Sequence, residues 1–193
     1  MTIENLHQLL ERIGNLIRNE SRLGLMEHGL QPVQFDALYY LSVCNRFSDT
    51  PKGVTEYLGL TKGTVSQSIK VLEAKGFVEK RADLGDKRIT HLVITSKGRA
   101  MVADLFPATV LKHLTDDSES YAEFKDAGLD LELLEEQLKT LLSLIQQQNQ
   151  RKTFGQCATC THLRHNPDGS HFCGLTQELL SHQDTQLICI EHS

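Results

Sequence analysis

The chain has no tryptophan, few aromatic residues and, outside its last part, almost no cysteine. Aromatic residues make up 6% of the 193 residues, which favours a helical protein with a Leu, Ile and Val core over a sheet sandwich. No apolar run approaches the ~20 residues of a membrane span, and the N-terminus lacks a basic-then-apolar signal segment. These absences predict a cytoplasmic protein with no membrane partner, whose thiols stay reduced.

The charge is unevenly distributed along the chain. The formal net charge of −5 argues by itself against nucleic acid as a partner. Residues 52–99, however, hold ten Lys/Arg and five Asp/Glu, a balance of +5, whereas residues 115–150 hold two Lys/Arg and nine Asp/Glu, a balance of −7. The basic stretch is therefore a candidate phosphate-facing surface, and a solvated face is the alternative.

Four cysteines lie within the last 37 residues, and Cys44 is the only other one. Cys157, Cys160, Cys173 and Cys189 have the spacing C-x2-C-x12-C-x15-C. In a reducing compartment, clustered cysteines bind metal more often than they form disulfides. Four thiolates are what one tetrahedral metal or one small iron–sulfur cluster needs. We therefore predict a metal site in this tail, which has few large apolar residues with which to fold unaided.

Two kinds of metal centre and one metal-free alternative fit this spacing. Zinc suits a closed site of four thiolates and implies a structural element or a zinc sensor. A [2Fe–2S] or [4Fe–4S] cluster also takes four cysteines, and would sense oxidants, nitric oxide or iron supply. A thiol switch without metal is the third alternative. Among the tail histidines, His162 is the best substitute ligand.

Apolar residues with heptad spacing lie near both ends of the remaining chain. Steps of three and four residues recur in two series, Ile3, Leu6, Leu10, Ile13 and Ile17, and Leu131, Leu134, Leu138, Leu141 and Ile145. A single helix cannot bury such a stripe alone, so we expect the two regions to form a shared homodimer interface. The alternative is that the two helices pack against each other within one chain.

The middle of the chain has the pattern of a helix-turn-helix. Residues 49–53 are predicted to form a turn, and the first helix of the motif ends at Gly59, since glycine can adopt the left-handed conformation of a tight turn. Thr61 is a good N-cap for the second helix, which stops at Gly76. In this motif the second helix enters the major groove, where we expect its polar face to contact DNA. The residues of that face are Lys62, Thr64, Ser66, Gln67 and Lys70.

The apolar period then changes to two, which predicts a β-hairpin. Residues 77–81 lead into a turn at Gly85, and residues 88–95 return. A basic hairpin directly after a recognition helix is a wing, and its tip carries Asp86, Lys87 and Arg88. Arginine suits a narrow minor groove. Phosphate would repel Asp86, so we expect this residue to hold Arg88 in place by a bidentate pair.

These residues resemble those of the MarR family of bacterial transcription regulators. The resemblance rests on residues 58–67, on residues 72–78, and above all on Asp86-Lys87-Arg88 followed by Leu92, Ile94 and Thr95. It covers roughly residues 3–150 and stops before the cysteine tail. It implies a homodimer with one winged helix in each subunit, binding to pseudo-palindromic operator DNA, and an Arg88 side chain that probes the minor groove.

Two other features of the family have a plainer interpretation here. Many members bind an aromatic acid between the DNA-binding and dimerisation regions, near Phe35, Tyr39 and Tyr40, so a small-molecule effector is a possible partner. Aromatic residues on a helix are more often core residues. Some members sense oxidants through one cysteine, but a lone Cys44 on an apolar helix is more often a buried small hydrophobe.

The sequence thus predicts a mainly α (α+β) fold in three parts. Residues 1–29 and 96–150 form a helical dimerisation region, residues 30–95 a winged helix-turn-helix domain, and residues 151–193 a metal-binding tail. The expected function is a MarR-type regulator, a repressor, whose metal site stabilises or controls DNA binding. The alternatives are a regulator that responds to a small aromatic ligand and has a purely structural zinc tail, or a partner-binding adaptor. The chain lacks the motifs of zinc hydrolases and deaminases, so no enzymatic activity is expected.

Overall fold

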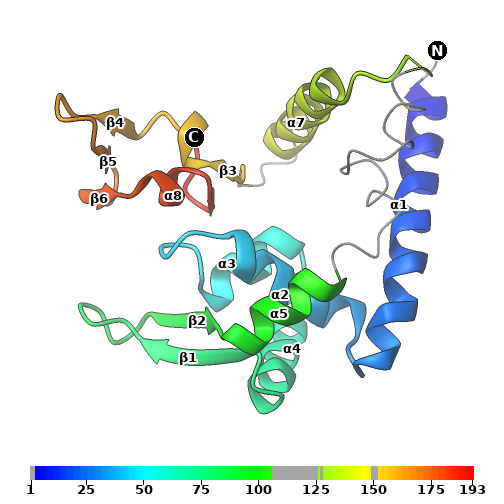
Figure 1. Cartoon of the computed structure of the whole chain (residues 1–193), viewed down its shortest axis with the longest axis horizontal. Helices are drawn as coiled ribbons and strands as arrows, with labels where there is room; N and C mark the ends of the chain where they lie inside the picture. Colours follow the sequence, from blue (N-terminus) through cyan, green and yellow to red (C-terminus); the bar gives the residue numbers. More distant parts are fainter. Residues whose placement is uncertain (1–2, 106–125, 127, 149–151) are drawn as a thin grey trace.

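The structure is a computed structural model, and it describes residues 3–105, 126, 128–148 and 152–193 (Figure 1). A long helix, α1 (Ile3–Glu27), comes first. It is followed by the helices α2 (Pro32–Val43), α3 (Pro51–Leu58) and α4 (Lys62–Ala74), the hairpin strands β1 (Val78–Ala82) and β2 (Thr90–Ile94), and helix α5 (Ser96–Leu105). Helix α7 (Leu131–Gln148) precedes the cysteine tail. The described residues therefore have the order of elements of a winged helix with flanking helices.

Helix α2 lies at the centre of the winged-helix domain. It packs against α3, α4, α5 and β2, and its Ala37, Leu38 and Tyr40 side chains are fully buried. Pro32 occupies the first turn of α2, where its missing N–H costs nothing. The remaining core comes from the apolar face of α4 and from the inner face of the hairpin, including Ile69, Leu72 and Leu92. This core fixes the recognition helix and the wing relative to each other.

The two helices of the motif meet as expected, but the first one begins earlier than predicted. Gly59 has φ 64° and closes α3, and the Thr61 hydroxyl accepts a hydrogen bond from the backbone N–H of Thr64. The predicted turn at residues 49–53 was wrong, because α3 starts at Pro51 with Thr50 as its N-cap. Gly53 lies inside this helix, and its position requires glycine because a Cβ atom there would lie 2.1 Å from the Ser48 carbonyl oxygen.

The wing is an antiparallel hairpin in which Val78 pairs with Ile94 and Ala82 with Thr90. The returning strand begins at Thr90 rather than at residue 88 as expected. The reason is a local turn: the Ile89 N–H donates to the carbonyl of Asp86, and the Asp83 N–H donates to that of Ile89. Arg88 therefore belongs to the tip of the wing.

The helices that carry the heptad stripes leave them exposed in the single chain. Helix α7 contains no buried residue, and Leu134, Leu138 and Ile145 are 37%, 44% and 46% exposed. Ile3 and Ile13 of α1 are also exposed. Residues 106–125, 127 and 149–151, where part of the expected dimerisation region falls, lie outside the described residues. Among the described helices, none has the length and apolar character needed to cross a bilayer.

The tail folds into short strands rather than an extended segment. Strand β3 (Gly155–Gln156) pairs with β7 (Ile188–Cys189), and β4 (Leu163–His165), β5 (His171–Cys173) and β6 (Glu178–Leu180) form a second sheet. A 3-10 turn (η3, Cys157–Thr159) and a short helix (α8, His182–Thr185) connect these strands. In Figure 1 the tail lies beside α3.

Candidate DNA-binding face and cysteine site

The polar face predicted for the recognition helix is presented to solvent. Helix α4 turns Val65, Ile69 and Leu72 into the core. The five residues expected to contact DNA are all exposed on the opposite face: Lys62, Thr64, Ser66, Gln67 and Lys70. Thr64 also accepts or donates a hydrogen bond to Thr61 across the cap, at 2.9 Å, which fixes its hydroxyl near the N-terminus of the helix.

The tip of the wing holds its arginine in a defined position. The Arg88 Nε and Nη2 atoms donate to the two carboxylate oxygens of Asp86, both at 3.0 Å, and the Arg88 backbone N–H donates to the same carboxylate. These hydrogen bonds lower the pKa of Asp86 and raise that of Arg88. The expected bidentate pair is present, and the Asp86 carboxylate fixes the orientation of the exposed Arg88 guanidinium. Lys87 is exposed beside it.

Two pockets border this face, and basic side chains line both of them. A groove of about 520 Å³ lies between α3, α4 and β1, and Lys52, Lys62 and Lys80 line it. A larger cleft of about 880 Å³ lies between the wing and the connection from α2 to α3, where Arg46, Arg81 and Arg88 line it together with Glu178 of the tail. The basic residues of the sequence thus surround the recognition helix and the wing, which suits contacts with phosphates.

All four tail cysteines line one small cavity. Cys157 and Cys160 come from the η3 turn, Cys173 from the end of β5, and Cys189 from β7. The Cys160 N–H donates to the carbonyl of Cys157, which closes the turn between them. The cavity has a volume of about 30 Å³, and His162 also lines it. The topology therefore gathers cysteines that are up to 32 residues apart (157 to 189) around one point.

The donor set at this cavity suits a metal, although the side chains are not arranged as ligands. Within the described residues, no group of three or more His, Cys, Asp or Glu side chains is set to hold a metal ion. The thiols are free, and Cys157 hydrogen-bonds to Cys189, which lowers the pKa of Cys189. The buried Thr176 hydroxyl, which also borders the cavity, has no hydrogen-bond partner among the described residues. An unpartnered buried donor is costly, and a metal-bound thiolate at this cavity would offer the Thr176 hydroxyl an acceptor.

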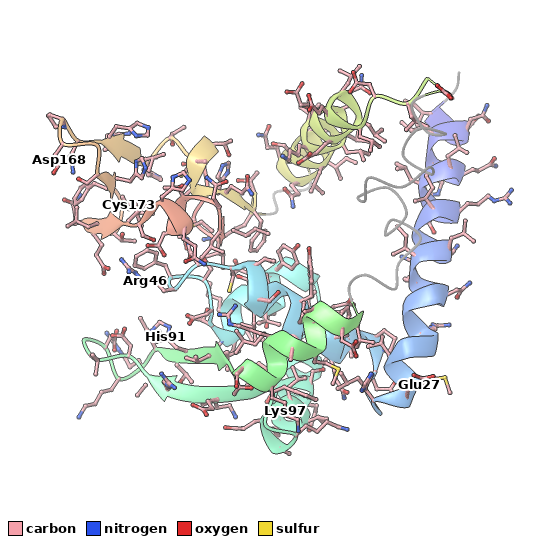
Figure 2. The ribbon with its side chains drawn as sticks, in the orientation of Figure 1. Glu27, Arg46, His91, Lys97, Asp168 and Cys173 are labelled. Carbon is pink, nitrogen blue, oxygen red and sulfur yellow. The ribbon has the colours of Figure 1, made fainter. Side chains whose placement is uncertain are left out.

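The tail docks on the connection between α2 and α3, which we call the interhelical loop (residues 44–50). The Asn45 side-chain amide donates to Cys157 Sγ at 3.5 Å, and the Asn45 N–H donates to the carbonyl of Ile188 at 2.8 Å. Arg46 donates to Glu178 Oε2 and to the carbonyl of Leu179 (Figure 2 shows its position below the tail). No local sequence pattern predicts these contacts, because they join residues more than a hundred positions apart.

An aromatic contact reinforces the docking. Phe154 packs edge-on against Tyr57 and Tyr40, with ring centroids 5.1 and 6.3 Å apart. Tyr40 is fully buried and stacks on Tyr57. Tyr40, considered above as near an effector site, is thus a core residue. Cys44 is also buried, and burial raises the pKa of its thiol to about 12, so it lacks the character of a reactive cysteine.

Comparisons with known proteins bear on the winged helix. A family model described as MarR family matches residues 28–89. The HTH-type transcriptional regulator YwaE of Bacillus subtilis is 33% identical over 117 residues, which cover 55% of this chain and 66% of YwaE. The transcriptional repressor MprA of Escherichia coli is 27% identical over 92 residues, which cover 48% of this chain and 52% of MprA. The matches thus span just under two thirds of the first relative and about half of the second.

A solved structure extends the likeness to the fold. CouR from Rhodococcus jostii, bound to p-coumaroyl-CoA, superposes with a TM-score of 0.55 at 20% identity, covering 72% of this chain and 90% of CouR. At this level of identity the likeness to CouR shows the fold alone. The matched stretch includes α2, α3, α4 and the tip of the wing with Asp86 and Arg88. In this part of its length the chain matches the MarR family model and is similar to transcriptional regulators, and its fold is a winged helix.

Proposed function

We propose that the protein is a homodimeric repressor that binds pseudo-palindromic operator DNA and carries a four-cysteine metal site. The observation that carries the DNA-binding part is the Arg88–Asp86 pair at the tip of a wing that follows an exposed polar recognition helix. In this arrangement α4 reads the major groove through Gln67 and the hydroxyls near its N-terminus. Arg88 enters the adjacent minor groove, and the lysines hold phosphates.

Two copies are needed because one recognition helix reads only half of a palindromic site. The exposed apolar stripes of α1 and α7 supply the surface for the second copy. Repression is favoured by the similarity to MprA, which is described as a transcriptional repressor.

The metal part of the proposal rests on the four cysteines that line one cavity. Rotation of the thiols toward this cavity would bring Cys157, Cys160, Cys173 and Cys189 around one ion. A closed set of four thiolates around one small cavity suits a single zinc ion. An iron–sulfur cluster is the alternative, and brown protein purified without oxygen would identify it.

Selection from a pool of random-sequence duplexes tests the DNA-binding part. We expect the purified protein to enrich sites with two symmetric halves about one helical turn apart. Affinity for such a site should fall steeply with salt, and Arg88→Ala should weaken binding about tenfold and reduce the salt slope by about 1. Thr140→Glu, on the polar side of α7, is the matched control and should bind as the wild type does. No enrichment, together with salt-insensitive binding, would favour the adaptor alternative.

A further inference from the structure

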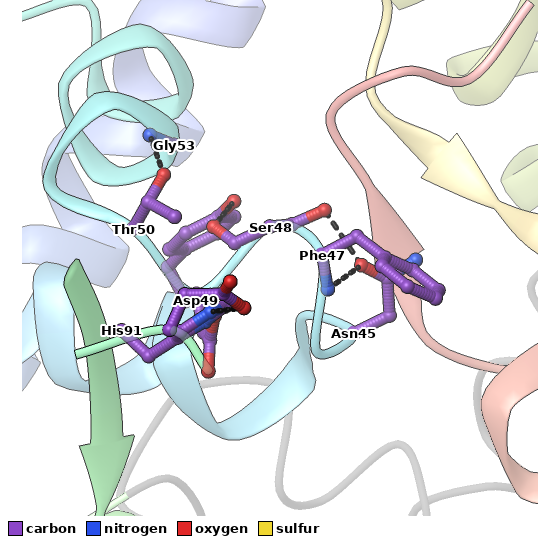
Figure 3. A network of polar contacts seen from close by, with 9 residues as sticks. Asn45, Phe47, Ser48, Asp49, Thr50, Gly53 and His91 are labelled. Carbon is purple, nitrogen blue, oxygen red and sulfur yellow. Dashed lines mark hydrogen bonds and ion pairs between the residues drawn. The ribbon is translucent and has the colours of Figure 1, made fainter. Parts of the chain in front are cut away.

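We infer that the interhelical loop transmits the state of the four-cysteine site to the wing, so that filling the site tightens operator binding. The inference rests on the proposed metal site and names its mode of regulation. The loop lies between the tail and the hairpin, and its polar side chains contact both (Figure 3). Asn45 and Ser48 are its buried polar residues, at 1% and 0% exposure.

The first contact is between Asn45 and the cysteine site. Asn45 donates through Nδ2 to Cys157 Sγ, so the strength of this hydrogen bond depends on the position and the charge of the sulfur. A thiolate held by a metal is a fixed, charged acceptor, and hydrogen bonds to charged acceptors are stronger than those to neutral ones. Groups that donate to metal-bound ligands also orient them. Filling the site therefore strengthens the hold of the tail on Asn45.

The side-chain oxygen of the same asparagine accepts two hydrogen bonds from within the loop. Asn45 Oδ1 accepts from the Phe47 N–H at 3.1 Å and from the Ser48 hydroxyl at 2.7 Å. The Ser48 hydroxyl in turn accepts from the N–H of Ile190, one residue after Cys189. Among the contacts of the loop with the tail, two therefore lie at the cysteines: Asn45 contacts Cys157 itself, and Ser48 contacts Ile190, next to Cys189.

The loop then contacts the wing through Asp49. The carbonyl of Asp49 accepts from the Leu92 N–H at 2.6 Å, and its carboxylate pairs with His91 Nδ1. His91 Nε2 pairs with Asp83 at 3.1 Å. Asp83 also accepts from the N–H groups of Gly85 and Asp86, which form the turn that carries Arg88. Polar contacts therefore lead from Cys157 through Asn45 to Ser48, the peptide bond joins Ser48 to Asp49, and further polar contacts run through His91 and Asp83 to Asp86, which orients the wing arginine.

This route differs from a shift of the dimerisation helix. A loop held at both cysteine-bearing ends of the tail keeps Asp49 in place, and Asp49 keeps the base and turn of the hairpin in the position in which Arg88 is presented. A wing that is already ordered loses less conformational entropy when it binds DNA, so the filled site raises affinity without any new contact with DNA.

Operator affinity with and without zinc tests the inference. The full chain is stripped by a chelator under reducing, oxygen-free conditions and then reloaded with zinc, and binding to a duplex recovered from the random pool is measured by fluorescence anisotropy. For the wild type we expect about tenfold tighter binding when zinc is loaded. For Asn45→Ala we expect zinc to bind but the difference to fall below about twofold. Asn166→Ala, an asparagine in the β4–β5 turn of the tail, is the matched control and should keep the wild-type difference.

A second variant and a second readout guard against misfolding of Asn45→Ala. Ser48→Ala removes the acceptor of the Ile190 N–H and should also reduce the zinc-dependent difference. In the wild type, zinc should slow the hydrogen exchange of the Leu92 amide, which is bonded to Asp49, and both loop variants should lose this effect. If the wild type binds no zinc, the proposed metal site is wrong. If it binds zinc but its operator affinity does not rise, or if both loop variants keep the tenfold difference, the metal site stands and the transmission is overturned.

Discussion

His91 connects the wing to the interhelical loop by lying between two carboxylates. Asp49 on one side and Asp83 on the other raise the pKa of His91 above 6.5, chiefly through the hydrogen bond to Asp49. The hydrogen bond from the Asp86 N–H is the main cause of the lowered pKa of Asp83, and the His91 imidazole adds to it. At Asp49 burial dominates and raises the pKa of the carboxyl. The sequence offered no reason to single out this histidine, because its partners come from separate elements.

The raised pKa of His91 predicts a pH dependence of stability. A base whose pKa is higher in the folded state contributes stability that is fully present below its unfolded pKa, near 6.5, and is lost as the pH rises through the folded value. His91→Asn should therefore cost on the order of 1 kcal/mol at pH 6 and progressively less at higher pH. Urea unfolding of both proteins between pH 6 and 9 measures this difference.

Titration of Asp49 falls at lower pH than the range in which the His91 effect is measured. The raised pKa of the Asp49 carboxyl also makes the protein lose stability as the pH rises, but it does so through loss of the carboxyl proton in the acidic range. A gap between wild type and His91→Asn that is constant or grows from pH 6 to 9 would contradict the assignment of His91 as a charged bridge.

At the scale of the elements, α3 depends on a glycine that ordinary helix propensity disfavours. A Cβ on Gly53 would meet the Ser48 carbonyl oxygen at 2.1 Å and the Tyr40 hydroxyl at 2.7 Å, and Tyr40 donates to that same carbonyl. We expect Gly53→Ala to destabilise the protein by about 2 kcal/mol, because overpacking against backbone outweighs the gain in propensity. Urea unfolding measures the change.

Gly63 provides the matched control for that substitution. It lies in the first turn of α4, where the nearest atom to an added Cβ is the Thr61 hydroxyl at 3.9 Å. Gly63→Ala should leave stability unchanged or raise it by up to about 1 kcal/mol. Equal effects of the two substitutions on stability would show that the backbone of Ser48 leaves room for a Cβ atom at position 53.

The elements predicted well are those whose signals are local. Gly59 and Thr61 fix the turn and cap of the motif within a few residues, and the Asp86–Arg88 pair forms between residues two positions apart. The start of α3 was misjudged because Pro51 and Gly53 are also common in turns. Proline in a first helical turn and glycine against a neighbouring carbonyl are compatible with a helix, but only the packing of Ser48 reveals this.

At the scale of the whole molecule, the exposed apolar stripe on α7 predicts a dimer. Leu134 and Leu138 face solvent in the single chain, and a partner would remove this apolar surface from water. Leu134→Glu combined with Leu138→Glu should convert dimers into monomers in analytical ultracentrifugation. Operator affinity should also fall, since each half-site must then be bound by a separate monomer. Thr140→Glu on the polar side of α7 should leave the dimer intact. A wild type that sediments as a monomer at micromolar concentration would contradict the proposed assembly.

The tail shows where sequence reasoning stops. Its spacing indicated four cysteines that act together, and the structure places them around one cavity. Its docking surface was not foreseeable, because Asn45 and Cys157 are 112 positions apart and an asparagine in a loop is an ordinary residue. Buried Asn45 and Ser48 acquire their significance only from the tail atoms that reach them.

The central claim, that a winged helix similar to the MarR family here carries a metal site formed by the tail, is tested most directly by elemental analysis of the chain purified without oxygen. We expect colourless protein with one zinc per chain, and little or no zinc in the double variant Cys157→Ser, Cys173→Ser. A wild type that holds no more metal than this variant would contradict the account.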